Sequence, residues 1–597
     1  MSAILQQISV EPITASKPLE IGDLLVAYLE QLGVEYVFGI PGGAIEPLYN
    51  ALARSARRGS VRAIVARHET GGAFMAHGYA QNTGRLGVCC GTSGPGATNL
   101  ITGVSSAYES RVPMLVITAQ TAITHFGRDA FQESSCTGVN VLGMFEYCTA
   151  YNTLISHVEQ FEHKLCAAII TAFRESRPVH ISIPVDIFRA PANIKNPSYN
   201  LENFMQQDNL LDQVAVDKLK IILAEAKKPV FLIGESAAEG IGHIAELASR
   251  LNAPMISTPL GKGLVNAYHS LYRGIFGVSG HQEASDLLDN PDVDVIIAIG
   301  TTLGESASNS WDPQLLRNKK LIHVDARWSH FMHTPMASLH VHGRLSTILT
   351  QLLEDYPVNS CSTSTLTEND NLSFSLIELY KCYEENKLLN PQRLMYELPK
   401  KIPVHTLYLA DTGNSVYWAA HYLHPIDRRM SGARSIKGGN FQTGMEFGSM
   451  GWAIGAAIGA ALGNNDIPVV ALVGDGSWLM SGQELTVAVQ ESLNIIFIVL
   501  NDGALGTIKH GQRLAGAEQY AYEISFVDFA KMAEAMGARG ITINTTEDWI
   551  ALDFANLLQE SGPLVIDARI DGEQVPPISS RMKALGTVKA GYHDINE

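Results

Sequence analysis

Short runs of apolar residues alternate with helix-like segments along nearly the whole chain, and this alternation constrains the fold more than any other feature. The runs are rich in β-branched residues and are apolar throughout, rather than at every second position. Strands of that kind are buried on both faces, which is typical of parallel sheets covered by helices. The sequence therefore predicts an α/β chain of doubly wound parallel sheets, with ligands bound beyond the carboxyl ends of the strands. The runs are VEYVFGI, VRAIVAR, LGVCCG, PMLVITA, VHISIPV, KPVFLIG, PMISTP, DVIIAIG, KLIHVDA, HTLYLAD, IPVVALVGDG, NIIFIVLND and PLVIDARI.

Two polar stretches divide these runs into three blocks. Residues 190–210 are rich in Asn and Pro, and residues 356–374 are rich in Ser, Thr and Asn, as linkers often are. They predict domains over 17–190, 211–355 and 385–580, each with a six-stranded sheet. A length of 597 residues suits three domains of about 200 residues each.

Composition excludes several classes of function. Lys and Arg number 43 against 60 Asp and Glu, so nonspecific binding to nucleic acid or anionic lipid is not expected. The N-terminal segment lacks the basic and apolar regions of a signal peptide. The apolar window GWAIGAAIGAAL is too short to span a bilayer and predicts a buried, closely packed helix. The seven cysteines form no CxxC pair, which favours a reducing, cytoplasmic location.

Two acidic turns follow neighbouring strands in the third block. Asp475 lies between two glycines directly after VVALVG, and Asp502 follows NIIFIVLN, 27 residues later. That distance suits one strand-helix-strand crossover, which places the two strand ends side by side. Carboxylate oxygens together with phosphate oxygens are the ligands that Mg²⁺ prefers. The spacing therefore predicts a magnesium site that also receives a diphosphate.

A second candidate carboxylate, Glu69, lies between the strand VRAIVAR and a helix rich in Ala and Gly. Burial there would raise its pKa and suit it for passing a proton to a heterocycle. The alternative is a glutamate that only favours the helix N-terminus. Glycine loops Gly39–Gly43 and Gly91–Gly96 also lie at strand ends, but neither they nor any other segment matches GxxxxGK[ST].

Several separated motifs resemble the thiamine-diphosphate-dependent enzymes, most closely the acetolactate synthase large subunit. The motifs occur in the order usual for that family, and the resemblance covers about residues 20–585. They are FGIPGGAIEPLYNAL, RHETGGAFMAHGYA, GTSGPGATNL and GRDAFQE in the first block, and FGSMGWAIGAAIGAALG and VGDGSW with LND in the third.

The resemblance implies roles for individual residues. Glu69 matches the glutamate that protonates the aminopyrimidine ring of thiamine, and Phe131 and Gln132 match residues that face the substrate. The metal ligands would be Asp475, Asp502 and the carbonyl of Ala504, with Asp502 where the family usually has asparagine. Residues expected to contact the cofactor are Gly42, Gly413, Asn414, Ser415, Gly448, Met450, Gly474, Gly476 and Ser477. Gly43 and Gly511 would line the substrate pocket.

The resemblance also implies an activity and an assembly. Family members decarboxylate a 2-oxo acid and join the product to a second carbonyl, using thiamine diphosphate and Mg²⁺. The first block would bind the pyrimidine and the third the diphosphate and Mg²⁺, each in a different subunit, so a homodimer or homotetramer is expected.

Two departures from the family pattern concern the flavin and the substrate. Acetolactate synthases hold FAD on an arginine-rich turn, whereas Gly300–Ser306 carries no arginine, which argues against FAD. Gly511 stands where the family has a tryptophan that crowds the acceptor pocket. This predicts a bulkier, aromatic 2-oxo acid, as in the acyloin synthases of the scytonemin pathway, unless Tyr520 or His510 fills the space.

Other functions stay open at this point. An acetolactate synthase acting on pyruvate is the first alternative. A simple 2-oxo acid decarboxylase is disfavoured because the chain has no adjacent His-His pair. A flavin oxidase would need FAD, and an inactive homologue is disfavoured because Glu69, Asp475 and Asp502 are all present.

Overall fold

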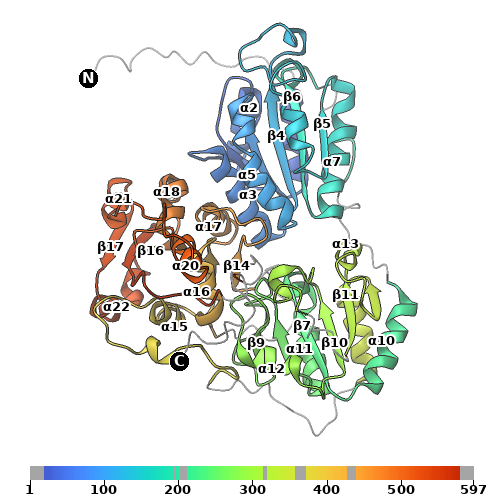
Figure 1. The fold of residues 1–597 in the computed structure, drawn as a ribbon. Helices are drawn as coiled ribbons and strands as arrows, with labels where there is room; N and C mark the ends of the chain where they lie inside the picture. The colour runs from blue at the N-terminus through green and yellow to red at the C-terminus, as the bar shows by residue number, and fades with distance from the viewer. Residues whose placement is uncertain are drawn as a thin grey trace.

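The computed structural model describes residues 19–192, 196–201, 211–312, 319–356, 371–426, 439–578 and 582. They form three six-stranded sheets with helices between the strands (Figure 1), as the sequence predicts. The paired strands in all three sheets are parallel. Most of the two predicted linkers lies outside the described residues.

The first sheet has the strand order β2-β1-β3-β4-β6-β5. Its strands are β1 (Tyr36–Gly39), β2 (Arg62–Val65), β3 (Gly87–Gly91), β4 (Met114–Gln120), β5 (Tyr151–Leu154) and β6 (Pro178–Pro184). Its helices are α1 (Ile21–Gln31), α2 (Glu46–Ala56), α3 (Glu69–Thr83), α4 (Pro95–Thr98), α5 (Ile101–Glu109), α6 (Val141–Phe145), α7 (Phe161–Glu175) and α8 (Val185–Phe188).

The middle sheet has the order β12-β11-β10-β7-β8-β9. Its strands are β7 (Pro229–Ile233), β8 (Met255–Ser257), β9 (Tyr272–Ile275), β10 (Val295–Ile299), β11 (Lys320–Asp325) and β12 (Leu339–His342). Its helices are α10 (Gln213–Glu225), α11 (Ile241–Leu251), α12 (Gln282–Asp289), α13 (Trp328–Phe331) and α14 (Leu345–Asp355).

The third sheet has the order β14-β13-β15-β16-β18-β17. Its strands are β13 (Leu407–Ala410), β14 (Phe441–Thr443), β15 (Val469–Gly474), β16 (Ile495–Asn501), β17 (Arg539–Ile543) and β18 (Leu564–Arg569). Its helices are α15 (Pro391–Lys401), α16 (Asn414–Tyr422), α17 (Trp452–Gly463), α18 (Asp475–Ser481), α19 (Leu485–Gln490), α20 (Gly506–Leu514), α21 (Phe529–Ala535), α22 (Thr546–Ala551) and α23 (Phe554–Leu557).

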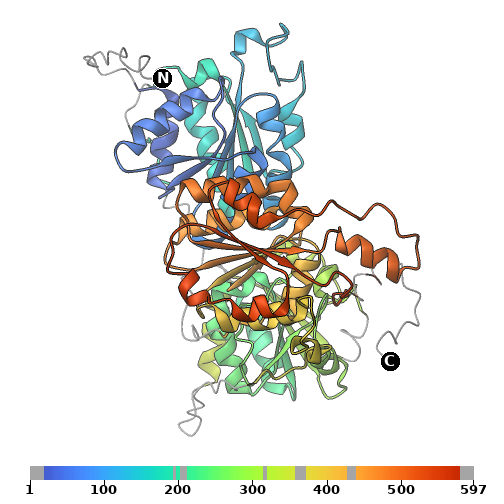
Figure 2. The same ribbon diagram turned by 90° about the vertical axis from the view of Figure 1, so that its left-hand side faces the viewer.

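Helices α3 and α17 join the first and third domains. α17 is the predicted small-residue helix, and its residues Trp452 to Leu462 are all buried. A methyl group on Gly459 would lie 1.9 Å from the carbonyl oxygen of Met75, and one on Gly78 would lie 2.1 Å from that of Ala456. Only glycine allows such a backbone approach. The two domains are therefore packed directly against each other, as Figure 2 shows.

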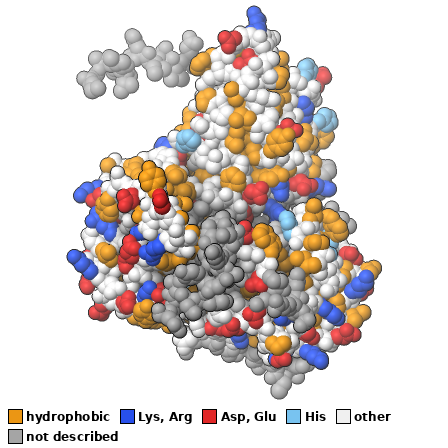
Figure 3. All heavy atoms as spheres, in the orientation of Figure 1, with side chains coloured by type: hydrophobic (Ala, Val, Ile, Leu, Met, Phe, Trp, Pro, Cys, Tyr) orange, Lys and Arg blue, Asp and Glu red, His pale blue; other side chains and the backbone are white. Residues whose placement is uncertain are grey.

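The surface carries both signs of charge. In Figure 3, basic and acidic side chains are interspersed over the lower two domains, while hydrophobic side chains gather over the body of the first. No helix in the described part of the chain has the length and apolar character needed to cross a membrane.

Candidate functional site

Asp475 and Asp502 follow the adjacent parallel strands β15 and β16, so the predicted juxtaposition is present. The Asp475 carboxylate is buried, with 2% of the residue exposed. Its Oδ1 accepts from the backbone N–H of Gly476 at 2.7 Å, and its Oδ2 accepts from that of Gly503 at 2.8 Å. The turn after β16 is thus folded around the Asp475 side chain.

The two carboxylates share one poorly solvated region. Burial raises the pKa of Asp475 to about 6. The pKa of Asp502 rises to about 7, because of burial and then because of the neighbouring Asp475 charge. A divalent cation between hard oxygen ligands would remove this repulsion. Among the described residues no third acidic, His or Cys side chain completes a metal-binding group, so a cation here would depend on backbone and cofactor oxygens as well.

Gly413 and Asn414, at the start of α16, approach the same turn, as expected for a loop that contacts the diphosphate. Asn414 Oδ1 accepts from Thr507 Oγ1 at 2.8 Å. A methyl group on Gly506 would lie 2.5 Å from Asn414 Nδ2 and 2.9 Å from Asp502 Oδ2. Gly413 has a φ of +114°, a conformation that other residues rarely adopt. Glycines at both positions therefore let the two loops meet.

Asp411, which the sequence reasoning missed, joins segments that carry predicted cofactor residues. It is fully buried at the end of β13. Its carboxylate accepts from the backbone N–H groups of Gly451 at 2.7 Å and Ala453 at 2.9 Å, and also from the side chain of Ser477. Its carbonyl accepts from Ser415 Oγ at 2.7 Å. These segments are distant in the sequence, and only the fold brings them together. The sequence did show that Asp411 ends the predicted strand HTLYLAD, the kind of position where ligands bind.

Two of the predicted cofactor residues, Gly476 and Met450, meet at the turn that begins with Asp475. A methyl group on Gly476 would lie 3.4 Å from Met450 Cε, so Met450 packs over that turn. Gly448 has a φ of +76°, a conformation that favours glycine. Apart from its chain neighbours, no described residue places an atom within 4 Å of the Cβ position of Gly474. The turn is therefore crowded on the Met450 side and open at Gly474.

Glu69 is the first residue of α3 and is 8% exposed. Its Oε2 accepts from Asn99 Nδ2 at 3.0 Å. A methyl group on Gly96 would lie 3.4 Å from its Oε1, and one on Gly42 would lie 2.7 Å from Thr92 Cβ. The Gly91–Gly96 loop therefore lies against this carboxylate, and the Gly39–Gly43 loop packs against that loop.

The residues predicted to face the substrate lie in both domains, with Phe131, Gln132 and Gly43 in the first and Gly511 in the third. Phe131 is 87% exposed. Gln132 packs against Gly94: its Cβ lies 3.2 Å from the position that a methyl group on Gly94 would take. Apart from its chain neighbours, no described residue places an atom within 4 Å of the Cβ position of Gly43. At Gly511 the nearest side chain among the described residues, its chain neighbours His510 and Gln512 aside, is that of Met582, with Cε and Sδ at 3.9 Å from the Cβ position, and Tyr520 has no atom within 4 Å.

Glu484, which carried no sequence signal, links the third domain to the segment that precedes Glu69. This buried residue of the third domain accepts from the backbone N–H groups of Arg67 at 3.0 Å and His68 at 2.8 Å, just before Glu69. A methyl group on Gly71 would lie 2.4 Å from Glu484 Oε1. Burial raises the pKa of Glu484 to about 7. The third domain thereby fixes the N-terminus of the helix that carries Glu69.

The turn Gly300–Ser306 of the middle domain follows β10 and is tightly packed. A methyl group on Gly234 would lie 2.4 Å from the Gly300 carbonyl oxygen, and one on Gly277 would lie 2.0 Å from that of Ser306. The turn offers no guanidinium to a flavin diphosphate. These residues do not fit the arginine-rich FAD-binding pattern. The expectation that FAD is not bound stays a prediction.

Comparison with known proteins matches all three domains to one family. Residues 19–139 match the thiamine pyrophosphate enzyme N-terminal TPP binding domain, 216–352 the central domain and 411–568 the C-terminal TPP binding domain.

Full-length relatives are acetolactate synthases. The chain is 30% identical to the acetolactate synthase large subunit of Corynebacterium glutamicum, over 93% of this chain and 88% of that protein. It is 30% identical to that of Haemophilus influenzae, over 95% and 98%. It is 27% identical to the acetolactate synthase of Arthrospira platensis, over 92% and 94%.

Proposed function

The chain belongs to the thiamine pyrophosphate enzymes, and from that premise we propose that it is an acetolactate synthase-like carboligase. It would decarboxylate one 2-oxo acid and join the product to a second carbonyl compound. The observation that carries the proposal is the pair of half-sites: Glu69 among the first-domain glycine loops, and Asp475 with Asp502 on the third-domain turn.

Each half-site would have its own task. Asp475 and Asp502 would hold Mg²⁺, with the Ala504 carbonyl as a further ligand, and the α16 loop at Asn414 would receive the diphosphate. Met450 would support the bent cofactor from its place over the Asp475 turn. Glu69 would hold and pass a proton at its Oε atoms, fixed by Asn99. When bound, thiamine diphosphate supplies the electron sink that makes decarboxylation possible.

We propose further that two copies of the chain assemble to join these half-sites. The hydrogen bonds at Glu69 and at Asp475 are each made within one domain. Large apolar side chains stand exposed in both domains, among them Phe131 and Tyr147 in the first and Met480 in the third. A second copy of this chain is the occupant that would cover them, in a homodimer or homotetramer.

The substrate we propose is a bulky, aromatic 2-oxo acid. Gly511 would provide space, because among the described residues other than its chain neighbours His510 and Gln512 only the unbranched Met582 lies within 4 Å of its Cβ position. Methionine can change its shape to admit a larger group. Pyruvate as the natural substrate is the alternative, in which case Met582 would replace the missing indole as the wall of the pocket.

The test is product analysis by mass spectrometry with thiamine diphosphate, Mg²⁺ and a mixture of pyruvate, phenylpyruvate and indolepyruvate. We expect acyloin products that contain an aromatic donor. Turnover of pyruvate alone would refute the aromatic substrate but leave the carboligase proposal intact. Release of aldehyde without any joined product would refute carboligation itself.

A matched variant isolates the role of Gly511. Gly511→Trp should lower kcat/KM for the aromatic acids by about 10–200-fold, because an indole fills the space, and should change that for pyruvate much less. Equal losses for both substrates would show that Gly511 does not select substrate size.

A further inference from the structure

The loop of residues 127–137, which carries Phe131, lies between strand β4 and helix α6 of the first domain. Asp129 and Gln132, on either side of Phe131, have φ angles of +56° and +58°. Residues other than glycine rarely adopt this left-handed conformation. A backbone of this kind persists only where the surrounding contacts determine it. The loop therefore depends on groups that hold its shape.

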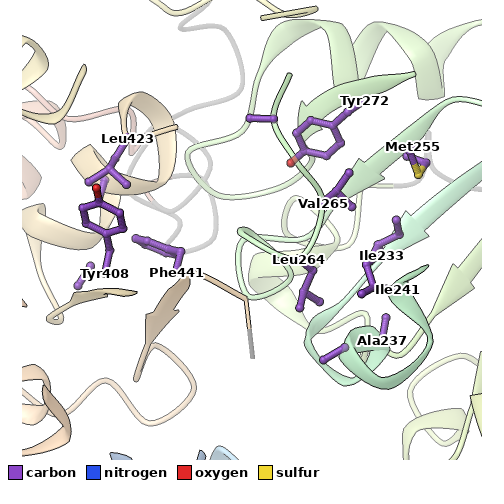
Figure 4. Close-up of a cluster of buried hydrophobic side chains, with 14 of the residues drawn as sticks. Ile233, Ala237, Ile241, Met255, Leu264, Val265, Tyr272, Tyr408, Leu423 and Phe441 are labelled. Atoms are coloured by element: carbon purple, nitrogen blue, oxygen red, sulfur yellow. The ribbon is translucent and has the colours of Figure 1, made fainter. Parts of the chain in front are cut away.

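The side chain of Phe131 points outward from this loop. Figure 4 shows how large apolar side chains usually lie in this molecule, with Tyr408 and Phe441 packed in the interior from neighbouring strands. Phe131, in contrast, is 87% exposed, the highest value among the large hydrophobic side chains that the structure describes. An aromatic side chain held outward in a fixed position is typical of a binding contact.

The carboxylate of Glu133 joins the two ends of the loop. Its Oε1 accepts from the backbone N–H of Gly127 at 2.9 Å and from the hydroxyls of Ser135 and Thr137. A methyl group on Gly127 would lie 3.7 Å from Thr137 Cγ2, so the two ends are side by side. The hydrogen bonds from Ser135, Thr137 and Gly127 lower the pKa of Glu133 to about 2. The carboxylate is therefore charged at neutral pH, which strengthens each of these hydrogen bonds.

Ser134, the next residue, attaches the loop to the body of the first domain. Gln120 at the end of β4 accepts from the Ser134 N–H at 3.3 Å and from its hydroxyl at 3.1 Å, and it donates to the Ser134 carbonyl at 2.8 Å. Ser134 Oγ also accepts from the backbone N–H of Gly94 at 3.1 Å. Gly94 belongs to the Gly91–Gly96 loop, which lies against Glu69. The base of the loop is thus tied to the segment beside Glu69, and Glu133 extends this order toward the tip.

We propose that Glu133 is a positioning residue, whose carboxylate holds the 127–137 loop in the shape that presents Phe131 to the substrate. The inference rests on the carboligase function proposed above. The three groups that donate to Glu133 all belong to the loop, so its influence on the reaction would pass through Phe131, without contact between Glu133 and the substrate. A loop that is ordered before the substrate arrives loses little conformational freedom on binding. Loss of the carboxylate should therefore weaken substrate binding more than it slows the chemistry.

A double-mutant cycle tests whether Glu133 acts through Phe131. Glu133→Gln keeps the size of the side chain and removes its charge, so KM for the 2-oxo acid should rise about tenfold while kcat changes less than about twofold. In a Phe131→Ala background the same substitution should raise KM less than about twofold, because the group that it positions is gone. Equal effects on KM in both backgrounds would overturn the proposal. Glu159→Gln, at an exposed glutamate of the same domain, is the matched control and should leave KM unchanged.

Limited proteolysis with trypsin measures the order of the loop independently of activity. Arg128 is exposed within the loop and offers a cleavage site, at which cleavage requires local opening of the chain. We expect Glu133→Gln to be cut after Arg128 about tenfold faster than the wild type, and Glu159→Gln to be cut at the wild-type rate. Peptide mass spectrometry identifies the cut. An unchanged midpoint of denaturant unfolding in Glu133→Gln would show that the opening is confined to the loop.

The two measurements separate a failure of this inference from a failure of the proposed function. A wild-type protein that turns over no 2-oxo acid would refute the proposed function, and with it the task of the loop. An active enzyme in which Glu133→Gln leaves the cleavage rate unchanged would overturn only the role of Glu133. Faster cleavage with an unchanged KM would overturn that role as well, because the shape of the loop would then not matter to substrate binding.

Discussion

Glu69 and Asp475 are both buried carboxylates at the start of a helix, but their partners differ. Glu69 has a neutral amide partner, Asn99, at one carboxylate oxygen and Gly96 near the other. Asp475 accepts backbone N–H groups and faces a second carboxylate, Asp502. A lone carboxylate held by an amide is suited to handling a proton, whereas a pair of like charges calls for a cation. The difference indicates two half-sites with separate tasks.

Removing the Glu69 carboxylate should affect turnover most and cofactor binding least. Glu69→Gln keeps the shape and the contact with Asn99 but loses the acidic proton, so kcat should fall about 10²–10⁴-fold. Glu35→Gln, an exposed glutamate of the same domain, is the matched control. Steady-state kinetics and thiamine diphosphate titration measure both quantities. Undiminished turnover in Glu69→Gln would contradict the assigned role.

Removing Asp475 should have the converse effect and weaken cofactor binding first. We expect Asp475→Ala to raise the concentrations of Mg²⁺ and thiamine diphosphate needed for half-maximal activity at least about 10–100-fold. Chelation of divalent cations from the wild-type protein should reproduce the loss, and added Mg²⁺ should restore activity. Normal cofactor affinity in the variant would place the cation elsewhere.

The acidic pair should also make stability depend on pH. The folded protein holds protons on Asp475 and Asp502 up to about pH 6 and pH 7, whereas both titrate near 3.8 when unfolded. The native state therefore binds more protons, and the free energy of unfolding without cofactor should fall as pH rises from about 4 to 7.

The variant Asp502→Asn removes the like charge and should reduce this fall by roughly 1–3 kcal/mol. Mg²⁺ with thiamine diphosphate should stabilise the wild type increasingly over the same pH range, because the cation binds the ionised pair. Denaturant unfolding at several pH values measures both effects. Identical pH profiles for wild type and variant would refute the coupling.

Loss of the amide partner of Glu69 should have the smallest effect. Asn99→Ala removes one side-chain hydrogen bond worth about 1–3 kcal/mol to a charged group, so kcat should fall about 5–100-fold, less than in Glu69→Gln. A larger loss than in Glu69→Gln would show that Asn99 itself carries the chemistry.

The sequence predicted the interior of each sheet better than its edges. Strands such as β15 and β16 are continuous apolar runs because both faces are covered. The strands it missed, β5, β9, β12, β14 and β17, all lie at sheet edges, where a strand can be short or partly polar. The crossover rule then sufficed to place Asp502 beside Asp475.

The sequence could not show which distant segments contact one another in the fold. Asp411 joins the start of α17 to Ser477, and Glu484 reaches from the third domain to the residues before Glu69. Each looks ordinary in its own segment, because its partners are brought to it only by the packing of sheets and helices. Met582 beside Gly511 is of the same kind.

The central claim is that Glu69 of one copy and Asp475 of another complete one active site, and co-expression of two inactive variants tests it most directly. Glu69→Gln and Asp475→Ala would carry different affinity tags, so that the mixed dimer can be isolated. In that dimer one site has both residues intact and the other has neither, so we predict about half of wild-type activity. Mixed dimers as inactive as either parent would show instead that each chain forms its own site, and would contradict the account.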